Sequence, residues 1–416
     1  MMKKRFCYFV LAFFLVVISF QQSCITYTKT TGNKNFSYLY NPTQTTIHPN
    51  IQFYFKNSNE LTMYMSFTNK NLKFIGNTTT IKMFYSVFTD FNNINTPLDS
   101  GIIIINPLKN AKQTHLELDL KIKNNTKFII YLKITDEITK FAFENYYFFN
   151  NKSENYTYNF LITDSSTGKI ISTNFINSTF KIQHNTSDTL YVYVYNFYNK
   201  IPNLPFSTKQ FTFDFPEEKE DSFFVILNNE YISPEYGKIY LIKSNTALKG
   251  GKVVSCFYKG FPKVKTPYQM LLPLKYLTNK TEFENYLTYK DKKQAVDDFW
   301  LNYGKNKYNA KEMIKVYYNR VILSNIMFTD YKPGWQTDRG MIFIVFGPPK
   351  YVYKSSNSEK WVYSLSNTAP LEFVFNKYQN PYFENTYVLK RMLDYKSIWF
   401  QAVNTWRSGK VYAVSN

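Results

Sequence analysis

Long stretches of the first 260 residues alternate apolar and polar side chains. Over residues 61–67 every second side chain is apolar, and over residues 116–122 three charged side chains separate four aliphatic ones. Successive side chains of a β-strand point to opposite faces of its sheet, so this period of two predicts strands with one buried and one wet face. An α-helix would spread the same residues around its circumference and could not bury them on one side.

Three short apolar runs in the same region, residues 102–105, 128–132 and 223–227, show no such alternation and predict strands buried on both faces. Turn sequences such as Asp164–Gly168 separate the runs, and strands recur about every ten residues. This spacing favours antiparallel β-sandwiches, and the stretch is long for one sandwich and fits two. We therefore expect β-sandwiches at residues 36–150 and 151–261.

The pattern changes after Pro262, where apolar residues recur at helical spacing. We expect one helix beginning with a capping box at Thr281–Glu284, one over 294–303 ended by Gly304, and one capped by Asn309. An antiparallel meander should follow, with a closing helix over 394–406. The predicted strands of the meander are residues 341–346, 361–365, 371–375 and 386–389. The expected fold class is therefore mainly β, with a mixed α+β C-terminal domain at residues 262–416.

Two residue types are concentrated in this C-terminal part. All five tryptophans lie between residues 300 and 406, and no arginine occurs between Arg5 and Arg320. Arginine supplies a planar fork of five donors that lysine cannot imitate, and tryptophan buries a large area with one N–H donor. We expect the C-terminal domain to depend on these side chains.

The first residues have the layout of a secretion signal. Three basic residues, 3–5, precede an uncharged run from Phe6 to Phe20, which as a helix would be roughly 22 Å long and short for a membrane span. Ser23-Cys24 then resembles the lipobox of bacterial lipoproteins, with Gln21 in place of the usual leucine. We expect residues 1–23 to be a signal peptide, Cys24 to be acylated and residues 24–35 to form a tether; the alternative is an ordinary cleaved signal peptide.

The lipoprotein resemblance also implies a location. Ile25 stands where an aspartate would retain an enteric lipoprotein at the inner membrane, and no acidic export signal follows Cys24. We therefore expect a lipid anchor in the outer membrane, facing the periplasm. Without the three basic residues of the signal peptide, the net charge of +20 becomes +17, which favours an anionic envelope surface or an acidic partner, although an AT-rich genome would also enrich lysine. An exported protein seldom meets nucleic acid, so we expect an envelope protein or a glycan as partner.

A compact motif lies at the centre of the C-terminal domain. Residues 334–340 read Gly-Trp-Gln-Thr-Asp-Arg-Gly, followed by an apolar run and Gly347-Pro348-Pro349. With the matching segments at 299–300, 359–363, 373–375 and 406–409, this resembles the GWxTD domain, found mainly in lipoproteins of Bacteroidota, over about residues 265–410. Lys350 departs from the acidic residue that many members carry there. The family has no established biochemical activity, so the resemblance implies a compartment and a fold rather than a reaction.

The motif itself favours a tight corner. Gly334 and Gly340 are expected to bracket a turn that requires positive φ, and Gly347-Pro348-Pro349 to close the first strand of the meander. Asp338 and Thr337 can accept backbone N–H groups.

Adjacent residues of an extended segment point to opposite faces, so Asp338 and Arg339 should have different partners. The candidates are Arg320, Arg391 or a lysine for Asp338, and Glu359 or Glu372 for Arg339.

The alternative to a structural corner is a ligand-binding cleft lined by Trp335, Asp338, Arg339 and Trp361. A catalytic variant would use Asp338 and Glu359 as a carboxylate pair. The residues of interest for either use are Gly334, Trp335, Thr337, Asp338, Arg339, Gly340, Gly347, Glu359 and Trp361.

Several classes of chemistry are disfavoured. The three histidines all precede residue 185, so the motif domain has no histidine for a nucleophile–base pair, and with no cysteine either it has no zinc ligands of the usual kind. Cys256 is expected to be a small buried hydrophobe. We assign no catalytic residue, metal or cofactor. The sequence favours a non-catalytic binding or scaffolding protein, with a periplasmic hydrolase that uses acidic residues of the cleft as the alternative.

Overall fold

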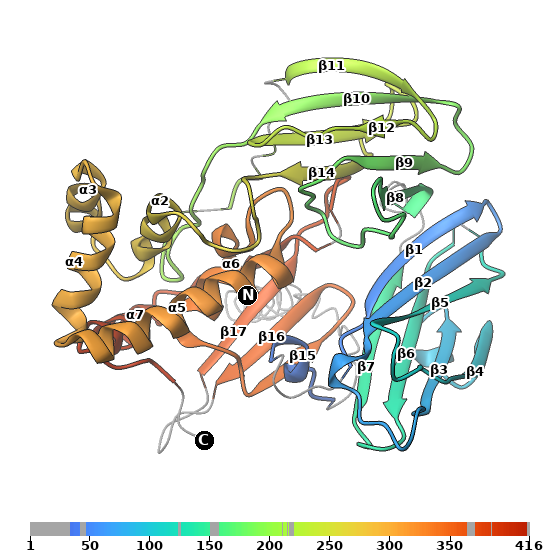
Figure 1. Ribbon diagram of the computed structural model, residues 1–416, viewed down its shortest axis with the longest axis horizontal. Coiled ribbons are helices and arrows are strands. Elements are labelled where there is room, and N and C mark those ends of the chain that lie inside the picture. Colours follow the sequence, from blue (N-terminus) through green and yellow to red (C-terminus); the bar gives the residue numbers. More distant parts are fainter. Residues whose placement is uncertain are drawn as a thin grey trace, which may run out of the picture.

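The computed structural model describes residues 34–41, 47–123, 126–149, 158–209, 211–213, 215, 220–363, 371–383 and 385–413. Figure 1 shows three packed parts: a sandwich of blue to teal strands, a second of green to yellow strands, and a module of helices with orange to red strands. Cys24 and the expected signal peptide lie outside the described residues. None of the helices described is both long and apolar enough to cross a membrane.

The first sandwich consists of two antiparallel sheets around one hydrophobic core. One sheet has the order β1-β2-β5, with bounds Asn50–Asn57, Glu60–Thr68 and Gln113–Leu120. The other has the order β4-β3-β6-β7, with bounds Asp99–Ile105, Ile81–Phe88, Phe128–Asp136 and Ala142–Phe149. The alternating pattern at residues 61–67 produces strand β2, whose apolar side chains are buried in this core.

The second sandwich has the same construction. One sheet has the order β11-β10-β13-β14, with bounds Glu220–Leu227, Thr189–Asn196, Lys238–Lys243 and Lys252–Cys256. The other has the order β12-β9-β8, with bounds Tyr231–Ile232, Phe180–His184 and Phe160–Asp164. Cys256 is fully buried in the core between them, and burial raises the pKa of its thiol to about 11, as befits a small hydrophobe.

Two of the three apolar runs are not buried on both faces. Strand β6 is, but β4 exposes Ile102 and Ile104 by more than half, and β11 exposes Phe223, Val225 and Leu227. Both are edge strands, and within the described part of the chain no second layer covers their outer face. The expectation was wrong because a local run of apolar residues does not encode whether a further layer packs on the strand.

The C-terminal module combines helices with a four-stranded antiparallel meander, β15-β16-β17-β18. The strands have the bounds Tyr351–Lys354, Ser358–Tyr363, Leu371–Lys377 and Tyr387–Leu389. The helices are α2 (Pro267–Leu271), α3 (Lys280–Thr288), α4 (Lys292–Gly304), α5 (Lys307–Phe328), α6 (Asp338–Phe346) and α7 (Tyr395–Arg407). Their apolar faces and the sheet share one core that contains all five tryptophans. The fold class, mainly β with a mixed α+β C-terminal part, is confirmed.

Three helices begin earlier than expected, and one of them is α4, which begins at Lys292 rather than at residue 294. The cap of α3 is Asn279, whose side chain accepts from the backbone of Glu282, and Glu282 completes the capping box in return. Helix α5 is capped by Asn306 rather than Asn309. For α3 and α5, two candidate caps lie within three residues of each other, and local spacing does not choose between them.

The larger correction concerns residues 341–346, which form the body of helix α6 and not a strand. Every residue of this helix is buried, so its sequence lacks the polar face from which a helical period could be recognised. Gly347, at φ 85°, therefore ends a helix rather than the first strand of the meander.

Candidate functional site

The motif begins as a short 3₁₀-helix, η7 (Gly334–Gln336), and continues as α6. Thr337 joins the two: its hydroxyl donates to the Gly334 carbonyl at 2.8 Å and accepts from the Gly340 amide at 3.1 Å, as an N-cap. The expectation that Thr337 accepts a backbone N–H group is confirmed, although the group belongs to a helix rather than to a turn before a strand. Asp338 lies in the first turn of α6, where its negative charge is favourable.

The two glycines of the motif permit close packing. A Cβ on Gly334 would lie 1.8 Å from the Ser324 carbonyl oxygen of α5, and one on Gly340 would lie 1.9 Å from the Gly334 carbonyl oxygen. Neither has positive φ, so the expected reason for these glycines was wrong. The residues are glycine because three backbone segments touch at this point.

Asp338 faces one side of this corner. Its two carboxylate oxygens lie 2.5 and 3.1 Å from the guanidinium nitrogens of Arg391, and the backbone amide of Leu389 donates to it at 2.8 Å. Both charged side chains are less than 10% exposed. Of the three partners that the sequence allowed, the structure selects Arg391.

Arg320, the first alternative for Asp338, has another role. It donates to the carbonyls of Ile344 and Val345 at the end of α6, and to that of Tyr412. Burial lowers the pKa of its guanidinium to about 10. Arg320 therefore supplies hydrogen-bond donors to carbonyl groups at the C-terminal end of α6, and the several donors of its planar guanidinium allow it to reach more than one of them.

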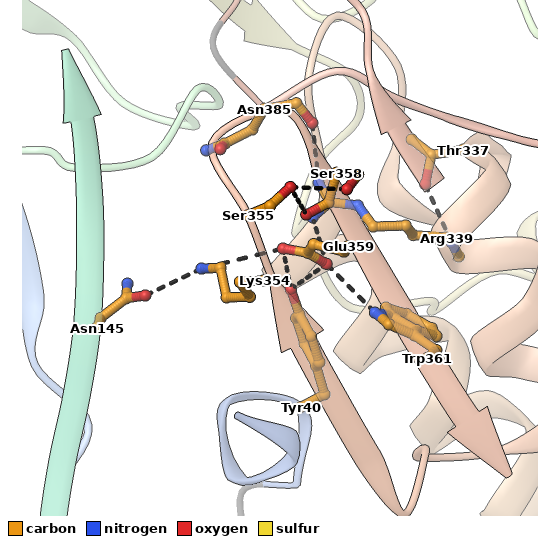
Figure 2. A network of polar contacts seen from close by, with 11 residues as sticks. Tyr40, Asn145, Thr337, Arg339, Lys354, Ser355, Ser358, Glu359, Trp361 and Asn385 are labelled. Carbon is orange, nitrogen blue, oxygen red and sulfur yellow. Dashed lines mark hydrogen bonds and ion pairs between the residues drawn. The ribbon is translucent and has the colours of Figure 1, made fainter. Parts of the chain in front are cut away.

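Arg339 contacts a different group of residues, several of which are drawn in Figure 2. Its guanidinium lies between the rings of Phe328 and Tyr387, donates to the Asn385 carbonyl at 2.8 Å, and has one nitrogen 3.6 Å from a Glu359 oxygen. Glu359, rather than Glu372, is the ionic partner. The expectation that Asp338 and Arg339 have separate partners is confirmed, although both lie on a helix.

Glu359 is the centre of a buried polar network, drawn in Figure 2. The Tyr40 hydroxyl lies 2.9 and 2.7 Å from its two oxygens, and the indole N–H of Trp361 donates at 3.2 Å. Burial, then the charge of Glu359, raises the pKa of Tyr40 well above its ordinary value, so Tyr40 is the donor. Lys354 lies 3.9 Å from the carboxylate on the side away from Trp361, and donates to Asn145 of strand β7 at 2.9 Å.

A family model described as the GWxTD domain matches residues 238–408. The chain contains a GWxTD domain. The match begins earlier than the resemblance over about residues 265–410 and takes in β13 and β14 of the second sandwich. No curated protein matches the chain.

The two charged residues of the GWxTD motif border different cavities. Asp338 and Thr337 line one of about 90 Å³, and Arg339 and Glu359 line another of about 370 Å³. Trp335 and Trp361 are buried in the core and line neither of these cavities. The four residues proposed to line one cleft are therefore divided between two cavities and the core.

The small cavity contains an acidic residue that the sequence did not single out. Asp330 is buried beside it, accepts from the backbone amide of Lys332, and lies 3.4 Å from the Thr386 hydroxyl. Burial raises the pKa of Asp330 to about 6. Its position in the turn sequence Asp-Tyr-Lys-Pro, directly before the motif, is a signal by which it could have been found.

A segment of the second sandwich closes this cavity. Residues 200–203 and 211–212 line it, Gln336 is hydrogen-bonded to Asn199 at 2.5 Å, and Arg391 donates to the Asn203 carbonyl at 3.0 Å. The Asp338 side of the motif is thus covered by the β10–β11 connection. Among the described residues, no group of three or more His, Cys, Asp or Glu side chains could hold a metal ion.

Proposed function

We propose that this chain is a lipid-anchored envelope protein, attached through Cys24 to the outer membrane and facing the periplasm, and that it is a non-catalytic binding or scaffolding protein. The signal-like N-terminus and Ser23-Cys24 support the anchor. An envelope protein or a glycan is the kind of partner that this location offers.

The observation that supports a non-catalytic role is the closed state of the motif. Both oxygens of Asp338 are engaged by Arg391, and both oxygens of Glu359 by Tyr40. A general acid or nucleophile needs a carboxylate that reaches a substrate atom. The motif's acidic groups instead contact side chains of the same chain.

The N-terminal segment also fits an anchored scaffold. Asn35 is hydrogen-bonded to the backbone of Lys350 and Val352, and the 3₁₀-helix η1 (Ser37–Tyr40) places Tyr40 on Glu359. Ten residues from Cys24 reach Lys34, and a fully extended chain of that length spans at most about 35 Å. A lipid on Cys24 would therefore hold the GWxTD domain close to the membrane surface.

Metabolic labelling with an alkyne fatty acid tests the anchor. We expect label on the wild-type protein in outer-membrane fractions and none on Cys24→Ala. Cys7→Ala is the matched control, since Cys7 would leave with the signal peptide, and it should be labelled as the wild type is. Labelling that survives Cys24→Ala would contradict the proposal.

One observation favours the second candidate, a periplasmic hydrolase. Asp330 and Asp338 border the same cavity, and a carboxyl with a pKa near 6 is suited to proton transfer at neutral pH. Against it, about 90 Å³ is well below the 300–1,000 Å³ typical of ligand pockets. Turnover of chromogenic glycosides or esters by the wild type and not by Asp330→Asn would establish the hydrolase.

A further inference from the structure

A third cavity, of about 710 Å³, lies between the two sandwiches. Its floor belongs to the sheet β1-β2-β5 of the first sandwich, and its opposite wall is formed by residues 167–170 and 172 of the second, which follow strand β8. Strand β8 lies beside β1, so the two walls face each other (Figure 1). The volume is within the range of small-molecule pockets.

The floor of this cavity is built from two rows of polar side chains, three in each row, that lie opposite one another on β1, β2 and β5. They are Gln52, Tyr64 and Glu117 in one row and Asn50, Ser66 and His115 in the next. The apolar side chains of β2, such as that of Met63, point to the other face and are buried in the core. The floor therefore presents donors and acceptors at the regular spacing of a sheet.

Several polar groups of this floor have no partner within the described part of the chain. The side chains of Asn50, Ser66 and His115 make no hydrogen bond to another described residue. Gln52 is only 8% exposed; its amide N–H donates to the Phe53 carbonyl at 3.0 Å, while its amide oxygen accepts no bond from the residues described. A nearly buried amide oxygen beside a cavity favours a molecule there that donates to it.

The charges of the lining balance each other. Among the described residues that line this cavity, Glu117 is the only carboxylate and Lys169 is the only lysine or arginine. Lys169 donates to the amide oxygen of Gln113 at 2.9 Å. Glu117 accepts from Lys56 at 2.8 Å. The lining thus offers no excess of either charge, and its amides and hydroxyls both donate and accept, which suits a neutral ligand rich in hydroxyl groups.

The opposite wall begins in a turn that the chain itself holds in place. One carboxylate oxygen of Asp164 accepts from the backbone amides of Ser166 and Thr167 at 3.1 and 2.9 Å. The other oxygen accepts from the Ser178 hydroxyl at 2.6 Å. A wall that is ordered before a ligand arrives lowers the entropic cost of binding.

Three features favour a chain of sugar units over a peptide or a single sugar. Tyr64 is half-buried on the floor, and a ring in this position offers an apolar surface to the C–H face of a sugar. Strand β2 is hydrogen-bonded on both sides, so the middle of the floor has no free backbone edge with which an extended peptide could pair. Gln52 and Ser172 also line the cavity of about 370 Å³, so the two cavities adjoin and can accept a ligand of several units.

We propose that the cavity between the sandwiches binds a neutral oligosaccharide, whose hydroxyl groups bond to Gln52, Asn50 and His115 and one of whose rings packs against Tyr64. The inference rests on the proposed binding role, and it selects a glycan rather than an envelope protein as the partner. Both sandwiches line the site, so a bound saccharide contacts both of them.

Isothermal titration calorimetry on the full-length protein, in a polyoxyethylene detergent that contains no sugar, tests this site. The probes are cellotetraose, maltotetraose and chitotetraose, and a neutral tetrapeptide of glycine and serine is the control ligand. We expect saturable binding of at least one saccharide at up to millimolar concentration and none of the peptide. The affinity should change little between about 0.1 and 0.5 M salt, because the recognition is between neutral groups.

Tyr64→Thr should weaken saccharide binding about tenfold or more, because it removes the apolar surface against which one sugar ring packs while it keeps a residue that favours strands. The matched control is Tyr231→Thr, since Tyr231 is exposed on β12 and lines neither cavity. His115→Ala is a second variant on the edge strand β5, where the side chain is exposed, and it should weaken binding about threefold. The melting temperature of each variant verifies that it is folded.

Absence of saturable binding of all three saccharides, binding of the tetrapeptide alone, a steep loss of affinity with salt, or equal loss in Tyr64→Thr and Tyr231→Thr would overturn the inference. The lipid anchor would then still be decided by the labelling experiment alone. Shortening of a bound saccharide, detected by product analysis, would instead overturn the non-catalytic role and leave the site in place.

Discussion

Asp338→Asn is the substitution that best separates a structural corner from a working site. Asp338 and Arg391 form a two-point ion pair, and both side chains are nearly inaccessible. Burial raises the pKa of Asp338 even though Arg391 opposes it. The ion pair itself therefore contributes little net stability, and the cost of the substitution comes from the partner that is left behind.

That partner is a buried guanidinium. Among the described residues, Arg391 has no hydrogen-bond acceptor for its Nε, so loss of the carboxylate charge would leave it with still less compensation. Removing one member of a buried pair costs about 3–5 kcal/mol. For a domain of this size, about 2–4 °C per kcal/mol gives a fall in melting temperature of about 6–20 °C.

Tryptophan fluorescence is the appropriate assay, because all five tryptophans are buried in the core of the C-terminal module and report its unfolding selectively. Asp394→Asn is the control, since Asp394 is exposed, makes no side-chain cap, and should change stability by less than about 0.5 kcal/mol. Combining Asp338→Asn with Arg391→Gln should cost about 1–3 kcal/mol less than the sum of the single changes. An unchanged or higher melting temperature for Asp338→Asn would refute the structural role and favour a binding or catalytic site.

Three further substitutions test the rest of the corner. Gly340→Ala should destabilise the domain by about 3 kcal/mol or more, because the new Cβ would lie 1.9 Å from the Gly334 carbonyl oxygen; a melting temperature within a degree of wild type would contradict this. Tyr40→Phe should cost about 1–3 kcal/mol and speed proteolysis within residues 34–41, since it removes the hydroxyl that binds Glu359; unchanged cleavage would argue against this anchor. The pKa of Asp330 is about 6 in the folded protein and 3.8 in the unfolded chain, so the native state favours the protonated carboxyl. The stability of the wild type should therefore fall as the pH rises from about 4 to 6. In Asp330→Asn this fall should disappear, and the free energy of unfolding at pH 7 should exceed that of the wild type by up to about 3 kcal/mol. If the free energy of unfolding changes with pH in the same way in both proteins, Asp330 does not titrate as described.

Local patterns predicted those features that depend on neighbouring residues alone. Alternation identified strand β2, because a period of two records which face of a strand is buried. The separate ion pairs of Asp338 and Arg339 were foreseen for a similar reason: adjacent side chains diverge, so one partner cannot serve both. The geometry behind that argument was a strand, whereas the residues lie on a helix, and the conclusion holds for both.

Features that depend on distant parts of the chain could not be predicted from local sequence patterns. Helix α6 is buried on every side, so its apolar run resembles a buried strand, and only Thr337 as a cap and Asp338 in the first turn indicate a helix. Tyr40 and Glu359 are 319 positions apart, and no local signal connects them. The glycines of the motif are required by carbonyl groups of α5 and η7, which a reading of turn propensity does not include.

The two charges of the motif connect it to different parts of the chain, and this explains why an Asp-Arg pair occurs there. Asp338 holds Arg391, which in turn donates to Asn203 in the second sandwich. Arg339 lies against Glu359, which holds Tyr40 of the N-terminal segment and is shared with Lys354, a contact of the first sandwich. A lysine at position 339 could approach the carboxylate of Glu359. Its ammonium group is not planar, however, and could not contact the rings of Phe328 and Tyr387 and donate to the Asn385 carbonyl at the same time, as the guanidinium of Arg339 does. The motif is therefore the place where both sandwiches and the N-terminal segment that contains Tyr40 are connected to one helix.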